Sequence, residues 1–199
     1  ITYIYYLNAD YFNTLKFARK FQTLYPKNEN IAYIDFLIAM TFYEQVQIVA
    51  RDQTYTKAAL KEFRNIVKKY PTSKYAKESE LKIDLINEQL AGKHMYLARF
   101  YMKKSKWISA LKRLNIIIEK YPETIYTVEA LHRLVEIYYK LGNVTLAKKY
   151  AATLGYNFND SDWYKKTYKI VVDQNYQEDT KVTKRKLRDK IKNVLKLSK

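Results

Sequence analysis

The residues of this chain that could do acid–base or metal chemistry are two histidines and a short run of carboxylates. His94 and His132 lie in different predicted helices, and neither belongs to a metal-ligand motif, so we interpret both as packed or surface residues. Glu78, Glu80 and Asp84 have the spacing of a solvated helix face alongside lysines. These groups do not form the convergent set that catalysis needs.

Other reactive motifs are missing from the sequence. The three glycines are scattered, so no glycine-rich phosphate loop can be assembled. The chain has no cysteine, which excludes disulfides and thiolate metal sites within it. We therefore predict a protein that is not an enzyme and has no metal or cofactor.

The stretch from Ser105 to Pro122 shows how the elements are built. Its apolar residues recur at helical spacing on one face: Trp107, Ala110, Leu111, Leu114, Ile117 and Ile118. We predict Trp107 to lie in the core, and the small Ala110 to let a neighbouring helix approach closely. Pro122 ends the helix, because a proline pushes the preceding residue out of the α region. This is the pattern of a tetratricopeptide helix pair.

The dipeptide Tyr-Pro recurs at Pro26, Pro71 and Pro122. The separations are 45 and 51 residues, whereas a standard tetratricopeptide has about 34. Lengthened first helices would explain the surplus. With only three Gly and three Pro, the chain is predicted to be all-α, a tetratricopeptide-repeat solenoid of antiparallel helix pairs.

We expect a repeat array over residues 1–172, with a first repeat missing and about four helix pairs plus a closing helix visible. The expected helices are 1–8, 11–24, 31–49, 55–69, 73–104, one within 105–122 that stops at Tyr121-Pro122, 128–141, 144–154 and 163–172. The long helix should carry one apolar stripe, made of Leu81, Leu85, Ile86, Leu90, Leu97 and Tyr101, with a possible kink at Gly92.

Two C-terminal segments follow the array. Residues 173–180 are expected to be a polar linker, and 181–199 a basic C-terminal helix or tail. The tail keeps an apolar face, formed by Leu187, Ile191, Val194 and Leu195. This face could pack on the last repeat, or meet a partner or anionic lipid.

The net charge of +17 allows two interpretations. One is a basic helical-repeat module that binds nucleic acid or anionic membrane. The other is that the lysines, spread along every helix, form solvated faces. A generic peptide-binding tetratricopeptide receptor is a further alternative. No apolar run of about 18 residues, the length that spans a membrane, occurs in the sequence.

Four motifs resemble one known family, the ComL/BamD lipoproteins, in their alphaproteobacterial branch. They are RDQ at 51–53, LAGKHM at 90–95, ALHRLVEIYYKLG at 130–142 and LGYNFNDSDWY at 154–164. The resemblance covers residues 1 to about 172. It implies a tetratricopeptide array at the periplasmic face of the cell outer membrane, held there by an acylated N-terminal Cys that would lie upstream of this sequence.

The resemblance also implies partners and sites. The family is a non-catalytic scaffold of the outer-membrane β-barrel assembly complex. It binds the POTRA domains of BamA, other complex subunits and unfolded outer-membrane proteins, with no nucleic acid expected. Two basic positions that match the family's docking surface for POTRA domains are Lys104 and Arg113. The remaining face of its substrate groove would lie near Tyr5, Tyr6 and Tyr11.

Overall fold

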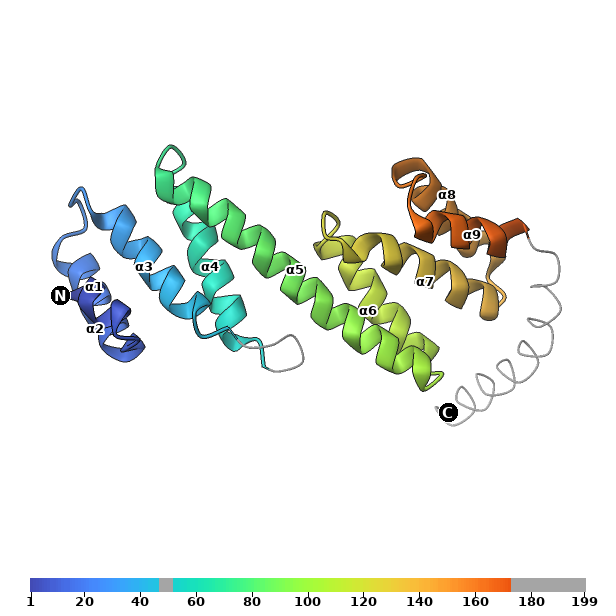
Figure 1. Ribbon diagram of the computed structural model, residues 1–199, viewed down its shortest axis with the longest axis horizontal. Helices are drawn as coiled ribbons and strands as arrows, with labels where there is room; N and C mark the ends of the chain where they lie inside the picture. The colour runs from blue at the N-terminus through green and yellow to red at the C-terminus, as the bar shows by residue number, and fades with distance from the viewer. Residues whose placement is uncertain (47–51, 173–199) are drawn as a thin grey trace, which may run out of the picture. The chain divides into compact units, whose positions relative to one another are not determined.

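The computed structural model describes residues 1–46 and 52–172, and every regular element in these residues is an α-helix (Figure 1). In chain order they are α1 (Thr2–Leu7), α2 (Tyr11–Leu24), α3 (Ile31–Tyr43), α4 (Thr54–Lys69), α5 (Lys74–Lys103), α6 (Trp107–Lys120), α7 (Tyr126–Lys140), α8 (Val144–Asn157) and α9 (Asp162–Val172). The predicted all-α class is confirmed.

The helices belong to two compact units, Ile1–Lys93 and His94–Lys199, whose boundary falls inside α5. In the first unit α1 packs on α2, α2 on α3 and α3 on α4. In the second, α6 packs on α7 and α7 on α8, while α9 lies against both α7 and α8. Helices that are neighbours in sequence are thus neighbours in space, which is the packing of a tetratricopeptide array.

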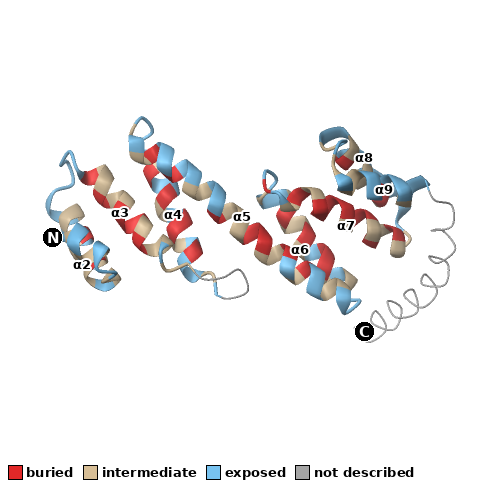
Figure 2. Ribbon diagram, viewed as in Figure 1, coloured by how far each residue is buried: buried red, intermediate tan, exposed pale blue. Residues whose placement is uncertain are grey.

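Many of the small residues at the packed faces of the helices are alanines. Eight alanines among the described residues have no exposed surface: Ala18, Ala39, Ala59, Ala91, Ala98, Ala110, Ala130 and Ala147. Larger apolar side chains fill the space on either side, and Figure 2 shows the buried residues as red patches along the helices. Ala110 is fully buried, as its predicted role requires, but Trp107 is half-buried, and the prediction that it belongs to the buried core is wrong.

One turn geometry joins each of four helices to the next. Three helices end at the tyrosine of a Tyr-Pro dipeptide, with φ between −133° and −136° at that tyrosine. These residues are Tyr25, Tyr70 and Tyr121. Phe158 ends α8 similarly, with φ −144°. In each case the residue's carbonyl accepts a hydrogen bond from the N–H three positions later, with N···O distances of 3.0 to 3.2 Å. The predicted stop at each Tyr-Pro is therefore confirmed.

A second geometry closes the pairs α1–α2, α5–α6 and α7–α8. Ala9, Ser105 and Gly142 have φ of 55°, 55° and 77°. Two backbone hydrogen bonds enclose each of these residues, as from Gly142 to Tyr139 and from Asn143 to Tyr138, both at 2.9 Å. This is a Schellman motif, in which the residue just after the helix C-cap has a left-handed backbone and glycine is therefore favoured.

Several predicted boundaries and one predicted stripe need correction. Helix α3 ends at Tyr43, so the prediction that the helix continues toward residue 49 is wrong for residues 44–46. The rest of that predicted range falls in residues 47–51, which lie outside the described residues. Helix α8 continues past Gly155 to Asn157. The predicted continuity of α5 through Gly92 is confirmed. Leu81 and Leu85 are exposed and do not share the buried face of α5. The predicted linker and tail, 173–199, also lie outside the described residues.

Candidate binding surfaces

The three tyrosines predicted from the family groove lie on α1 and at the start of α2, and all are half-buried. The Tyr5 ring stacks on that of Phe17 in α2, with centroids 5.2 Å apart and planes at 4°. Tyr6 donates a hydrogen bond of 3.4 Å to Glu44, just after α3. Burial and the Glu44 carboxylate raise the pKa of Tyr6 to about 12, with a smaller contribution from Tyr11. Tyr6 and Tyr11 are therefore neighbours, whereas Tyr5 holds α1 against α2.

An aromatic ladder on the first helices of successive pairs was missed by the sequence reasoning. Tyr3 of α1 lies 6.4 Å from Tyr33 of α3, measured between ring centroids, and Tyr33 lies 5.7 Å from Tyr75 of α5. The Tyr75 ring is also 5.4 Å from Phe36. The signal that could have found it is an aromatic residue near the start of each of these helices. The ladder presents ring faces and hydroxyl groups along one side of the first unit.

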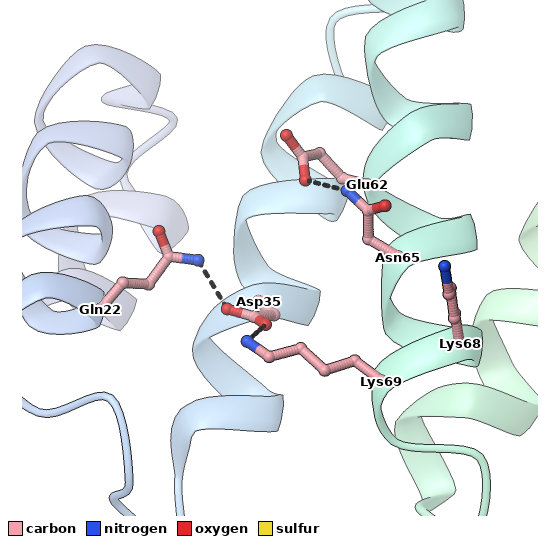
Figure 3. Close-up of a pocket in the computed structure, with 6 residues that line it drawn as sticks. All are labelled: Gln22, Asp35, Glu62, Asn65, Lys68 and Lys69. Atoms are coloured by element: carbon pink, nitrogen blue, oxygen red, sulfur yellow. Dashed lines mark hydrogen bonds and ion pairs between the residues drawn. The ribbon is translucent and has the colours of Figure 1, made fainter.

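A polar node ties α2, α3 and α4 together around Asp35 (Figure 3). Its carboxylate accepts hydrogen bonds from Gln22 at 2.6 Å, Lys69 at 3.2 Å and Tyr70 at 2.8 Å. The hydrogen bonds that the Lys69 ammonium donates to Tyr70 and Asp35, together with the attraction of the Asp35 charge, raise the pKa of Lys69. Asp35 thus has partners from both neighbouring helices, which makes it a structural tie.

Beside this node lies a polar pocket of about 440 Å³. It is lined by side chains of α2, α3 and α4: Gln22, Asp35, Glu62, Asn65, Lys68 and Lys69. Two carboxylates, two amides and two lysines make it suitable for backbone groups of a peptide rather than for an apolar ligand. Among the described residues no cluster has the ligands for a metal ion.

The two predicted docking cations lie in the second unit. Lys104 is exposed in the turn after α5, and Arg113 is half-buried in the middle of α6. Within the described residues neither side chain has an ion pair, so both charges can face a partner. Half-buried Trp107 starts α6, with the Lys140 ammonium 4.9 Å from its ring centroid. These side chains make the region around α6 cationic and partly aromatic.

A charge network on α7 was not predicted. Buried Glu129 pairs with Arg99 of α5 through two contacts, one of them 3.0 Å, and with Arg133 at 3.4 Å. Arg133 also donates to Glu136 at 2.8 Å. Burial alone would raise the pKa of Glu136, but hydrogen bonds from His132 and Arg133 lower it to about 2.

His132 connects this network to α9. The Thr167 hydroxyl donates to the Trp163 carbonyl at 2.8 Å, and its oxygen lies 2.7 Å from His132 Nδ1, within hydrogen-bond distance. His132 Nε2 lies 3.6 Å from the Glu136 carboxylate. The interpretation of His132 as a packed residue is confirmed, since it is buried and fastens α7 to α9.

No helix in the described part of the chain is both long and apolar enough to cross a membrane. The surfaces described above offer aromatic rings and a polar pocket in the first unit, and in the second two cations that form no ion pair with described residues; such groups are common at protein–protein interfaces.

Comparison with known proteins gives the following similarities. Residues 1–154 match the model of the YfiO family, described as an outer membrane lipoprotein. Outer membrane protein assembly factor BamD of Rickettsia prowazekii is 42% identical over 175 residues, which are 88% of this chain and 69% of that protein. BamD of Caulobacter vibrioides is 40% identical over 171 residues, 86% of this chain and 56% of that protein. BamD of Neisseria meningitidis serogroup A is 30% identical over 169 residues, 80% of this chain and 63% of that protein.

Proposed function

Since this chain belongs to the BamD family of outer-membrane lipoproteins, we propose that it is a non-catalytic scaffold subunit of the β-barrel assembly complex. The observation that carries the proposal is sequence identity of 40–42% with two BamD proteins over most of this chain. The all-α helix pairs support it, because stacked pairs offer long surfaces for protein partners.

The first proposed partner surface is the region around Lys104 and Arg113, which would dock the POTRA domains of BamA. Both cations lack ion pairs within the described residues. An acidic edge on the partner would therefore gain charge contacts without breaking existing ones. Such contacts chiefly set orientation and association rate, so salt should weaken the complex.

Charge reversal tests this surface. We expect Lys104→Glu/Arg113→Glu to weaken calorimetric binding to purified POTRA domains about tenfold, with unchanged helicity by circular dichroism. Lys112→Glu is the matched control, because Lys112 is an exposed lysine on the same helix. Unchanged affinity of the double variant, or an equal loss in the control, would remove this site from the proposal.

The second proposed surface is the aromatic side of the first unit, which would hold segments of unfolded outer-membrane proteins. The groove tyrosines Tyr5 and Tyr6 lie on α1 together with Tyr3, the exposed first residue of the aromatic ladder, and Tyr11 begins the neighbouring helix α2. Aromatic side chains bury a large area at low entropic cost, and this favours extended peptides that carry aromatic residues.

Peptide titration tests the groove. A labelled peptide with the C-terminal sequence of a barrel protein should bind the wild-type chain, and Tyr6→Ala/Tyr11→Ala should weaken it about tenfold. Tyr168→Ala serves as control, since Tyr168 is an exposed tyrosine of α9 in the other unit. If the control loses as much affinity as the groove variant, the tyrosines on α1 and α2 are not the site.

We further propose that the protein acts at the periplasmic face of the outer membrane through an N-terminal lipid anchor. The family description as an outer membrane lipoprotein supports this proposal. Sequencing the coding region upstream of Ile1 tests it. A signal peptide followed by a Cys at the cleavage site is the expected result, and a coding region without them would contradict the anchor.

A further inference from the structure

The first half of α5 carries exposed leucines that its own unit does not cover. Leu81 and Leu85 are 67% and 54% exposed. They are four residues apart, so they lie on one face on consecutive turns. The buried residues of this half, such as Ile86 and Leu90, lie on other faces. In Figure 2 the first half of α5 is largely pale blue, with exposed residues along much of its length.

Carboxylates border these leucines. At 100° per residue, Glu78 and Asp84 fall on opposite sides of the pair, and Glu80 lies next to Asp84. All three acids are exposed. In the described part of the chain none of the three forms an ion pair. We call Glu78, Glu80, Leu81, Asp84 and Leu85 together the acidic leucine stripe.

The nearby lysines do not neutralise the stripe. Lys82 lies within it in sequence, but its ammonium is 4.5 Å from the centroid of the Tyr43 ring, so it lies over α3. Lys74 lies over the Tyr75 ring, at 5.1 Å. Lys77, one turn before Leu81, is exposed and lies beside the stripe, so it offsets one of the three carboxylates. The stripe is therefore a negative surface with an apolar centre on a chain whose net charge is +17.

We propose that the acidic leucine stripe docks a basic amphipathic helix of a partner protein. Such a helix would set leucine or isoleucine, spaced three or four residues apart, against Leu81 and Leu85. Its flanking lysines or arginines would then face the three carboxylates. Nucleic acid and anionic lipid carry the wrong charge for this surface. The stripe shares no residue with the two partner surfaces proposed above, so this inference can stand or fall independently of them.

The probe for this proposal is a fluorescein-labelled synthetic helix of about 18 residues, made of leucines and lysines at helical spacing. Fluorescence anisotropy with the full chain at about 150 mM NaCl should show saturable binding. Leu81→Ser/Leu85→Ser should weaken it about tenfold through loss of the apolar contact. Glu80→Lys/Asp84→Lys should weaken it by a similar factor through charge reversal. All four positions are exposed, so the variants should keep the helicity of the wild type.

Matched controls test whether the loss of binding is specific to the stripe or follows from removing any exposed apolar side chains or reversing any exposed acids. Ile108→Ser/Tyr156→Ser removes two exposed apolar side chains elsewhere, and Glu123→Lys/Asp160→Lys reverses two exposed acids elsewhere. Both should bind the probe like the wild type. A peptide of the same composition in scrambled order should bind far more weakly.

Three results would overturn the proposal. The first is that the stripe variants bind the probe as well as their controls do. The second is that the scrambled peptide binds as well as the helical probe, which would reduce the effect to bulk charge. Sedimentation could also show self-association of the full chain that the leucine variant abolishes. The stripe would then be an interface between two copies of this chain, and not a site for a partner helix.

Discussion

At the scale of single residues, Glu129 is the carboxylate whose loss should cost the second unit stability. It is buried and meets Arg99 and Arg133, of which Arg99 is half exposed. Glu129→Ala would leave both guanidinium groups without this partner. We expect the free energy of unfolding to fall by about 2 kcal/mol, less than for a fully buried pair because water reaches Arg99.

Urea unfolding at neutral pH measures this change. The control is Glu123→Ala, an exposed glutamate in the turn before α7, which should stay within about 0.5 kcal/mol of the wild type. Equal losses in the two variants would show that the network around Glu129 does not stabilise the unit.

Glu136 should make stability depend on pH in the acid range. Its pKa falls from 4.5 in the unfolded chain to about 2 in the folded one, so the folded state binds its proton less readily. The stabilisation is complete above about pH 4.5, and it is lost as the pH falls from 4.5 toward 2. The shift corresponds to at most about 3 kcal/mol. Glu136→Gln should therefore flatten the fall of stability across this window.

Urea unfolding at several pH values from about 2.5 to 5 gives the comparison. Glu123→Gln, in which no buried partner is lost, should keep the slope of the wild type. A Glu136→Gln curve parallel to the wild-type curve would contradict the role given to this carboxylate.

The sequence could predict single-residue roles only where the neighbours are close in sequence. Ala110 was predicted to be buried because the apolar residues around it in sequence define the buried face of its helix. Arg99 and Glu129 are 30 positions apart, and His132 and Thr167 are 35 apart. Such pairs depend on how helices pack, which local spacing does not determine. The same holds for Tyr5, Tyr6 and Tyr11, whose separate contacts no motif reveals.

At the scale of elements, the turns that close the helix pairs predict that substitutions at two equivalent turn positions change the free energy of unfolding in opposite directions. Ser105 and Gly142 both have a left-handed backbone, with φ 55° and 77°. Glycine adopts this conformation without strain, whereas a side chain costs about 1 kcal/mol. Ser105→Gly should therefore raise the free energy of unfolding by about that amount, and Gly142→Ala should lower it by a similar amount.

Thermal and urea unfolding of the two variants check this pair. Ser109→Gly, inside α6, is the control for glycine as such and should destabilise, because glycine weakens a helix interior. A loss of stability in Ser105→Gly would mean that its backbone strain is not relieved by removing the side chain.

Helix positions were predictable to within a few residues because their ends carry strong local signals. Tyr-Pro ended α2, α4 and α6 at the expected residues, and Gly142 follows α7 as expected. The turns at Ala9 and Ser105 were missed because neither residue is a glycine. Leu81 and Leu85 were misassigned because the buried face of α5 shifts around the helix along its length. Apolar spacing alone does not follow such a shift.

At the scale of the whole molecule, the excess positive charge should make stability sensitive to salt. The chain has 37 Lys and Arg against 20 Asp and Glu, and like charges repel one another more in the compact state. Screening by NaCl should therefore raise the melting temperature. A gain of about 1 kcal/mol corresponds to about 2–4 °C for a chain of this size.

Differential scanning calorimetry from about 20 to 300 mM NaCl measures this effect, with an equal osmolality of sucrose as control. A melting temperature that falls with NaCl would mean that attractive ion pairs outweigh the repulsion.

The fold class could be predicted at this scale because it follows from composition and from the repeated Tyr-Pro dipeptides that end helices. The partner surfaces could be proposed only through family resemblance, because a cationic helix face looks the same whether it meets solvent or protein.

The same turn follows Tyr25, Tyr70, Tyr121 and Phe158, so the chain has four equivalent junctions at which helix pairs could be exchanged. Backbone angles at the three Tyr-Pro junctions agree within a few degrees, with ψ of 55°, 54° and 47°. Phe158, with ψ 43°, shows that the same joint forms without proline. A Tyr-Pro cassette should therefore fit at Phe158-Asn159, and hairpins exchanged between relatives should be cut at these joints rather than within the pairs.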